Sequence, residues 1–224
     1  MSTEMMKLLI ATNNPGKIKE YQDLLAGLPL ELTYPAQESL DIEVDETGGS
    51  FAENARLKAI AYARVSGLLT LADDSGLEVD ALSGEPGIRS ARYAGREASD
   101  EERYQLLLKN LKGVPWEERT ARFRCVIAVA TPAGQIHTAE GACEGVIAFA
   151  PKGEHGFGYD PVFYFPEYGM TMAELPLGIK NQVSHRARAA QGARKILEER
   201  LEVRGWILGI GYFAWEAKGD SCSQ

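Results

Sequence analysis

The sequence is poor in cysteine, and this scarcity excludes two classes of protein. Its three cysteines, Cys125, Cys143 and Cys222, are far apart and form no CxxC pair. Such a set supports neither a disulfide framework nor a zinc site. Cys125 and Cys143 lie in strand-like stretches, where a free thiol packs as a small apolar side chain. We therefore expect a cytoplasmic protein in a reducing compartment.

An excess of positive charge is also missing. The chain carries 24 Lys and Arg against 32 Asp and Glu, which gives a formal net charge of −8 at pH 7. Long nucleic acids are bound through basic surfaces, so we expect no nucleic acid polymer as a partner. A small polyanion can still bind where cations cluster locally.

Long apolar runs are absent as well. The N-terminus has no apolar region behind a basic start, so no secretory signal is expected. The stretch "GWILGIGYFAW" at residues 205–215 is shorter than the roughly 20 residues of a membrane helix. We expect no membrane partner. The same stretch is too apolar for a free tail, which indicates a packed element or an oligomer contact.

Strand and helix patterns alternate in the first half of the chain. The expected elements, in order, are strands at 7–12 and 30–35, a helix at 15–28, a helix at 51–66, a strand at 68–75, a helix at 99–113, a hairpin at 122–151, a short strand at 157–166 and a helix at about 184–203. Ser50 and Glu53 have the spacing of a capping box, and Ser99 and Glu102 repeat it. This order predicts one α/β fold with a mixed sheet.

Residues 69–82, "LTLADDSGLEVDAL", place two acids at the end of an apolar run. Asp, Ser and Gly favour turns, so Asp73 to Gly76 fit a simple turn. Alternatively, Asp73 and Asp74 hold a metal ion at the C-terminal end of a strand, where α/β proteins place ligands. This stretch alone favours the turn.

The segment "ATNNPGK" has the physical features of a phosphate loop. A strand leads into a Gly-containing turn, and Pro15 suits the first turn of a following helix. Free backbone N–H groups at such a helix start bind anions, and Lys17 adds a charge. The alternative is an Asn-Pro-Gly turn with a solvated lysine. In "DETGGSF", Glu46 precedes a helix whose dipole favours acids, and Lys58 lies in that helix.

Aromatic and cationic residues gather in two later segments. In "GEHGFGYDPVF", glycines flank Phe157 and let the backbone approach a ligand, while Phe157 and Tyr159 offer flat rings. In "GIKNQVSHRARAAQ", His185 and Arg186 open a helix, although the helix dipole favours anions there. This conflict indicates a ligand-facing site. The alternatives are a hairpin end with core aromatics and a cationic surface patch.

Together these segments resemble the inosine triphosphate pyrophosphatase family, the XTP/dITP diphosphatases. The matching stretches are "TNNPGK", "ETGGSFAENARLKA", "ADDSGLEVDAL", "GEPGIRSARYAG", "FGYDPVF" and "SHR", in the family's order. The resemblance implies one domain at 1–204 followed by an extension of unknown role at 205–224. It also implies an elongated α/β fold, with a mixed sheet and two lobes around a central nucleotide cleft, and a homodimer.

The resemblance further implies an enzyme that hydrolyses ITP, dITP and XTP to the monophosphate and pyrophosphate, with Mg²⁺ as cofactor. Asp74 would be the catalytic residue, and Glu46, Asp73 and Asp74 would bind the metal. The implied substrate-binding residues are Thr12, Asn13, Asn14, Pro15, Gly16, Lys17, Lys58, Ser75, Phe157, Gly158, Tyr159, Asp160, Lys180, His185 and Arg186.

We expect hydrogen-bond donors of the protein to select the purine base. Lys180, His185 and Arg186 are rich in donors and suit the C6 oxygen of deaminated purines, which adenine lacks. A backbone N–H near Phe157 is the candidate group that excludes the C2 amino group of guanine. Two rivals are a nucleotide sensor without hydrolysis, which would need no acids, and the septum-inhibitor-like pyrophosphatases, which prefer other bases.

Overall fold

The computed structural model describes residues 5–207. Its strands are β1 (Met6–Ile10), β2 (Leu30–Thr33), β3 (Leu69–Val79), β4 (Thr120–Ala130), β5 (Ile136–Ile147), β6 (Phe163–Phe165) and β7 (Met170–Thr171). Its α-helices are α1 (Pro15–Leu24), α2 (Phe51–Ser66), α3 (Asp100–Asn110), α4 (Leu177–Val183) and α5 (His185–Ile207). Short 3-10 helices are η1 (Asp80–Leu82), η2 (Gly87–Arg92), η3 (Trp116–Glu118) and η4 (Asp160–Val162).

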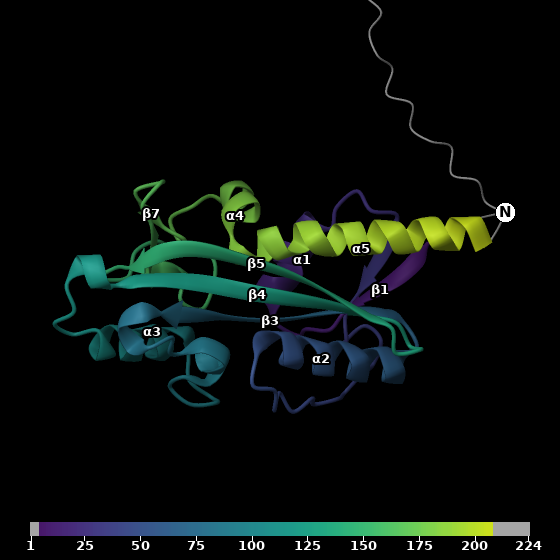
Figure 1. Ribbon diagram of the computed structural model, residues 1–224, viewed down its shortest axis with the longest axis horizontal. Coiled ribbons are helices and arrows are strands. Elements are labelled where there is room, and N and C mark those ends of the chain that lie inside the picture. The colour runs from purple at the N-terminus through teal and green to yellow at the C-terminus, as the bar shows by residue number, and fades with distance from the viewer. Residues whose placement is uncertain (1–4, 208–224) are drawn as a thin grey trace, which may run out of the picture.

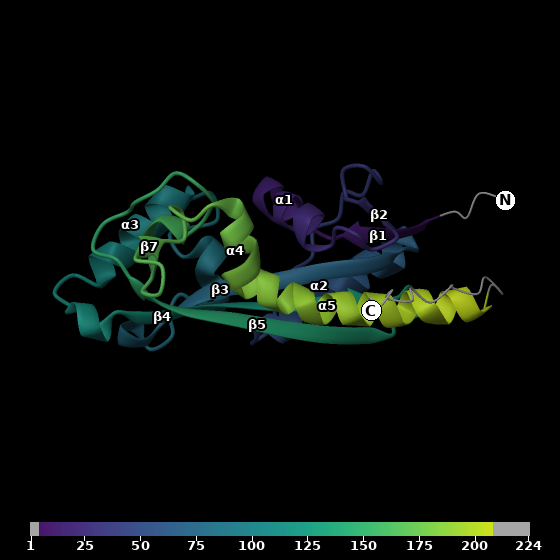
Figure 2. The same ribbon diagram turned by 90° about the horizontal axis from the view of Figure 1, so that it is seen from above.

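The strands form one seven-stranded mixed sheet in the order β2-β1-β3-β4-β5-β6-β7. β1 runs parallel to β2 and β3, whereas every later pair is antiparallel. Figures 1 and 2 show an elongated molecule with the long strands and α5 along its length. The predicted α/β fold with an elongated mixed sheet and flanking helices is therefore confirmed. The division into two lobes stays a prediction.

Helices cover both faces of this sheet. Figure 1 shows α1, α4 and α5 on one face and α2 and α3 on the other. Apolar clusters fill each layer, with Tyr21 and Leu197 in the α1–α5 layer and Ala55 and Ala59 under α2. α5 lies directly on β5, because a Cβ on Gly141 would come within 2.3 Å of the His185 carbonyl oxygen. This close contact leaves no room for a side chain at position 141.

The helix boundaries follow local signals in the sequence. Ser50 caps α2 by accepting from the Glu53 N–H at 3.2 Å, and Gly67 ends the helix in the left-handed conformation at φ 70°. Glu53 bonds back to the Gly49 N–H rather than to Ser50, so the expected box is only half formed. At α3 the full capping box of Ser99 and Glu102 is present.

The stretch with two aspartates does not turn. β3 continues through it to Val79, with Asp73 opposite Ile127 and Asp74 opposite Val126 of β4. The turn interpretation is therefore wrong, and the acids lie within a strand rather than at its end. Gly76 serves close packing instead, because a Cβ there would come within 2.4 Å of the Gly87 carbonyl oxygen.

Two further expectations are changed by the structure. Residues 157–162 form a loop and the 3-10 helix η4, so the predicted strand is shortened to β6. α5 continues to Ile207, beyond the helix end expected at about residue 203. Most of the apolar stretch at 205–215 lies outside the described residues. Among residues 5–207, no helix combines the length and apolar character needed to cross a membrane.

Candidate functional site

A cavity of about 280 Å³ opens beside β3 where β1 ends. β1 pairs with β3 only as far as Leu71, so the strand edge opens at Asp73 and Asp74. β1 lies between β2 and β3, and α1 and α2 cover opposite faces of the sheet. This is a topological switch point, where open α/β sheets bind ligands.

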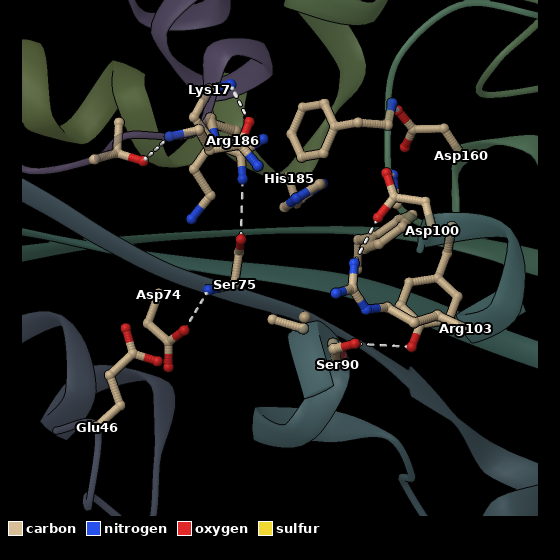
Figure 3. Close-up of a pocket in the computed structure, with 18 of the residues that line it drawn as sticks. Lys17, Glu46, Asp74, Ser75, Ser90, Asp100, Arg103, Asp160, His185 and Arg186 are labelled. Atoms are coloured by element: carbon tan, nitrogen blue, oxygen red, sulfur yellow. Dashed lines mark hydrogen bonds and ion pairs between the residues drawn. The ribbon is translucent and has the colours of Figure 1, made fainter. Parts of the chain in front are cut away.

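Most of the predicted site residues meet in this cavity (Figure 3). Those that line it are Thr12, Asn14, Lys17, Glu46, Lys58, Asp74, Ser75, Phe157, Gly158, Tyr159, Asp160, Lys180, His185 and Arg186. Four predicted residues do not line it, namely Asn13, Pro15, Gly16 and Asp73.

The N-terminal loop is organised by its own side chains. Asn14 caps α1 by accepting from the Lys17 N–H at 3.1 Å, and Pro15 fills the first turn as predicted. Thr12 Oγ1 accepts from the Asn14 N–H at 3.1 Å. Gly16 has a packing role, because a Cβ there would come within 2.5 Å of the Phe157 ring. The loop thus presents a helix N-terminus and Lys17 to the cavity, which suits a phosphate.

Asp74 and Glu46 form the acidic end of the cavity. Asp74 accepts from Asn54 Nδ2 and from the Ser75 N–H, each at 3.0 Å. Burial and the charge of Glu46 raise the pKa of Asp74 to about 6, against the opposing charge of Lys58. Lys58 pairs with Glu46 and donates to the Asp73 carbonyl oxygen at 3.1 Å. Figure 3 shows the two carboxylates pointing toward each other.

This pair of carboxylates suits a divalent cation. Mg²⁺ is bound by one or two protein carboxylates together with water and substrate phosphate oxygens. Burial, and after it the neighbouring charge of Glu46, disfavours the ionised form of Asp74, and a bound cation would offset both. Among the described residues, no group of three His, Cys, Asp or Glu side chains is placed to hold a metal. Glu46 and Asp74 therefore fit the ion as a two-carboxylate set.

Asp73, the expected third ligand, lies apart from that pair. Its side chain is 2% exposed, and Lys17 Nζ and Arg186 Nη2 lie 3.0 and 3.2 Å from its Oδ2. Burial alone would raise the pKa of Asp73, but the charges of Lys17 and Arg186 hold it well below its usual range. Asp73 therefore anchors two cations on the α1–α5 side of the sheet.

Buried ion pairs continue from Asp73 to the loop at Phe157. Glu20 on α1 joins Arg186 Nη1 at 2.6 Å and Lys180 Nζ at 2.8 Å. Lys180 also lies 2.5 Å from Asp160 Oδ2. The charges of Lys180 and Arg186 are thus largely satisfied within the protein, and the chain of pairs links the phosphate loop to residues 157–160.

His185 faces the same cavity as a neutral ring. It stacks on Phe123, with ring centroids 4.6 Å apart and planes 13° apart. Burial and the charges of Arg186 and Lys180 lower the pKa of His185 well below its usual range. Its Nδ1 is buried and has no hydrogen-bond partner. His185 therefore offers a ligand an uncharged polar edge.

The backbone N–H groups near Phe157 are already engaged. The Phe157 N–H donates to Asp160 Oδ2 at 2.9 Å, and the Gly158 N–H donates to Asp100 Oδ2 at 2.7 Å. Both of these N–H groups are engaged within the protein, and the expectation that a backbone N–H of this stretch excludes the guanine amino group stays a prediction. The glycines beside Phe157 instead allow the loop to fold over these carboxylates.

Sequence reasoning missed one wall of the cavity. That wall includes Ser90, Asp100, Arg103 and Phe123. Tyr159 fixes it by donating its hydroxyl to the Ser90 carbonyl oxygen at 2.9 Å. The spacing of Asp100 and Arg103 in the capped first turn of α3 predicts their ion pair. Their approach to residue 158 is a tertiary contact across 58 positions of the chain.

Comparison with known proteins gives a consistent result. A model of the Ham1 family matches residues 8–196. The chain is 55% identical over 192 residues to a dITP/XTP pyrophosphatase of Desulforamulus reducens, covering 86% of this chain and 96% of that protein. It also resembles the solved structure of a HAM1 protein from Coxiella burnetii, with a TM-score of 0.79 and 41% identity, over 87% of this chain and 100% of that one. A nucleoside-triphosphatase / dITP/XTP pyrophosphatase structure from Mycobacterium abscessus gives a TM-score of 0.68 at 42% identity, over 84% and 98% of the two chains.

Proposed function

This chain belongs to the Ham1 family, and we propose that it hydrolyses the deaminated purine nucleotides ITP, dITP and XTP to the monophosphate and pyrophosphate. The observation that carries the proposal is the position of Asp74. It lies in a cavity beside Glu46, Lys58 and Lys17, next to a helix N-terminus suited to phosphate. A nucleotide sensor would have no need for this acidic pair.

The two ends of the cavity differ in chemistry, and this difference sets the orientation of the bound substrate. The triphosphate lies along Thr12 to Lys17 and Lys58, where two lysines and the N-terminus of α1 meet. The base then extends toward Phe157, Tyr159 and His185. Ser75, which accepts from Arg186 Nη2 at 2.9 Å, lies between the two ends.

Asp74 acts on the attacking water. The carboxylate accepts a water proton while the water oxygen bonds to the α-phosphorus, and the bond from that phosphorus to the bridging oxygen breaks. Pyrophosphate leaves with the electron pair, and the proton passes from Asp74 to solvent. Lys17 and Lys58 stabilise the negative charge that develops on the leaving group. Glu46 and Asp74 would hold Mg²⁺, which when bound would supply further positive charge to offset that of the phosphates.

The cofactor, the oligomeric state and the cellular location are further proposals. We assign Mg²⁺ as the cofactor on the fit of Glu46 and Asp74, which supports a two-carboxylate site. A homodimer is supported by the family resemblance alone. A cytoplasmic location is supported by Cys125 and Cys143, which are buried free thiols.

The direct test is pyrophosphate release from ITP, dITP, XTP, GTP and ATP, with Mg²⁺ and with a chelator. We expect kcat/KM for the three deaminated substrates to exceed that for GTP and ATP by at least about 10². The chelator should abolish turnover, and added Mg²⁺ should restore it. Binding of ITP without turnover would favour the sensor. A preference for other bases would favour the septum-inhibitor-like group.

A further inference from the structure

Arg103 places an unpaired donor in the wall of the cavity. Its Nη1 pairs with Asp100 Oδ1 at 2.7 Å, while its Nε is buried and donates to no acceptor. A buried donor without a partner costs about 1–3 kcal/mol, so most such groups are paired with protein or ligand. Arg103 lines the cavity, and Figure 3 shows its guanidinium extending toward the middle of it, where a bound ligand can accept from the group.

The position of Arg103 suits the base of the nucleotide, an argument that rests on the proposed function. Figure 3 shows Asp160, Asp100 and Arg103 following one another along one side of the cavity, away from Glu46 and Asp74. Asp160 and Asp100 also hold the adjacent N–H groups of residues 157 and 158, which keeps the two carboxylates together. With the triphosphate at the acidic end, this side faces the base.

The order of groups along this side matches the edge of a deaminated purine. That edge presents an acceptor oxygen at C6, an N1–H donor, and at C2 either hydrogen in hypoxanthine or oxygen in xanthine. Lys180, beside Asp160, is a donor, Asp100 is an acceptor, and Arg103 is again a donor. Guanine has an amino group at C2, which would set donor against donor.

We propose that Arg103, positioned by Asp100, is the specificity-determining residue that reads C2 of the purine. Its guanidinium donates to the C2 oxygen of xanthine, tolerates the hydrogen of hypoxanthine and opposes the amino group of guanine. The alternative donors are already used, because the N–H groups of Phe157 and Gly158 bond to carboxylates. Arg186 is likewise engaged, with its three nitrogens bonded to Asp73, Glu20 and Ser75.

The test compares substrates within one protein preparation. Arg103→Ala and Arg103→Met, the second of which keeps most of the buried stem, are assayed with XTP, ITP and GTP. Lys109→Ala is the matched control, because Lys109 is an exposed cation on the same helix. The ratio of kcat/KM for XTP to that for ITP does not depend on the fraction of folded enzyme, so partial unfolding cannot imitate the effect.

We expect both Arg103 variants to lower the XTP-to-ITP ratio by about 10- to 100-fold, the range for losing one charged hydrogen bond. The GTP-to-ITP ratio should rise, and Lys109→Ala should change neither ratio. The assignment would be overturned if the variants kept a ratio of kcat/KM for XTP to that for ITP within threefold of wild type. This holds even if turnover of both substrates falls equally. A wild type that does not prefer ITP and XTP to ATP would instead refute the proposed function.

Discussion

Asp73 and Asp74 are neighbours on β3, yet the protein treats them in opposite ways. Both are buried, at 3% and 7% exposure. The pKa of Asp73 is held below its usual range by Lys17 and Arg186, even though burial opposes this. The pKa of Asp74 is raised to about 6 by burial and by Glu46. One carboxylate is thus held by ion pairs, while the other accepts hydrogen bonds from Asn54 and Ser75.

The alternation of side chains along a strand explains the difference. Successive residues point to opposite faces of a sheet, so Asp73 and Ser75 face the α1–α5 layer, where Arg186 contacts both. Asp74 faces α2, where Asn54 donates to it. The strand thus places one acid against each of the two helical layers. The electrostatic surroundings of each acid are therefore set by the layer that covers it.

The largest effect that tests this contrast is expected for Asp74→Asn. The amide keeps the shape but removes the proton acceptor, so kcat should fall by about 10²–10⁴. Stability should hold or rise, because the carboxylate is disfavoured where it stands. Steady-state kinetics and thermal melting check both parts. A variant within about threefold of the wild-type rate would remove Asp74 from the mechanism.

Asp73→Asn should show the reverse pattern. Removing this charge from a buried ion-pair network takes away the partner of Lys17 and leaves Arg186 with Glu20 alone, at a cost of about 3 kcal/mol in unfolding free energy. Denaturant unfolding measures the loss. Addition of ITP should recover part of the stability if the variant still binds substrate. Wild-type stability for this variant would show that the ion pairs of Asp73 do not stabilise the fold.

Gly76→Ala probes how closely the Asp74 side of β3 is covered. The new methyl group would meet the Gly87 carbonyl oxygen at 2.4 Å, so η2 must shift, at about 1–3 kcal/mol. Gly178→Ala in α4 is the matched control, because no atom lies within 4 Å of its added Cβ. Equal melting temperatures for the two variants would contradict the packing role of Gly76.

The smallest expected effect is the response of stability to pH in metal-free protein. The folded pKa of Asp74, about 6, lies above its value in the unfolded chain, so the native state binds the extra proton between pH 4 and 6. Unfolding free energy from this residue should therefore rise by about 1–2 kcal/mol as pH falls from 7 to 5. Asp74→Asn should lack this rise, and an identical profile for both proteins would contradict it.

Local features of the fold could be predicted from the sequence. The caps at Ser50 and Ser99, the stop at Gly67 and the hairpin around residues 131–135 depend on contacts within a few residues. The family resemblance also selected the residues of the phosphate loop and the acids. The turn at Asp73 was wrong because turn propensity is outweighed by the continuous pairing of β3 with β4.

The sequence by itself determined the alternation of helices and strands, the helix ends and the kind of chemistry available. Only the tertiary structure decided which acid is free and which is paired. Glu20 and Arg186 are 166 positions apart, and Asp100 reaches Gly158 across 58. Such contacts depend on the path of the whole chain and on which helix covers each face of β3. No local sequence pattern predicts these contacts. The place of Arg103 in the cavity wall likewise depends on the packing of α3 beside the loop at Phe157.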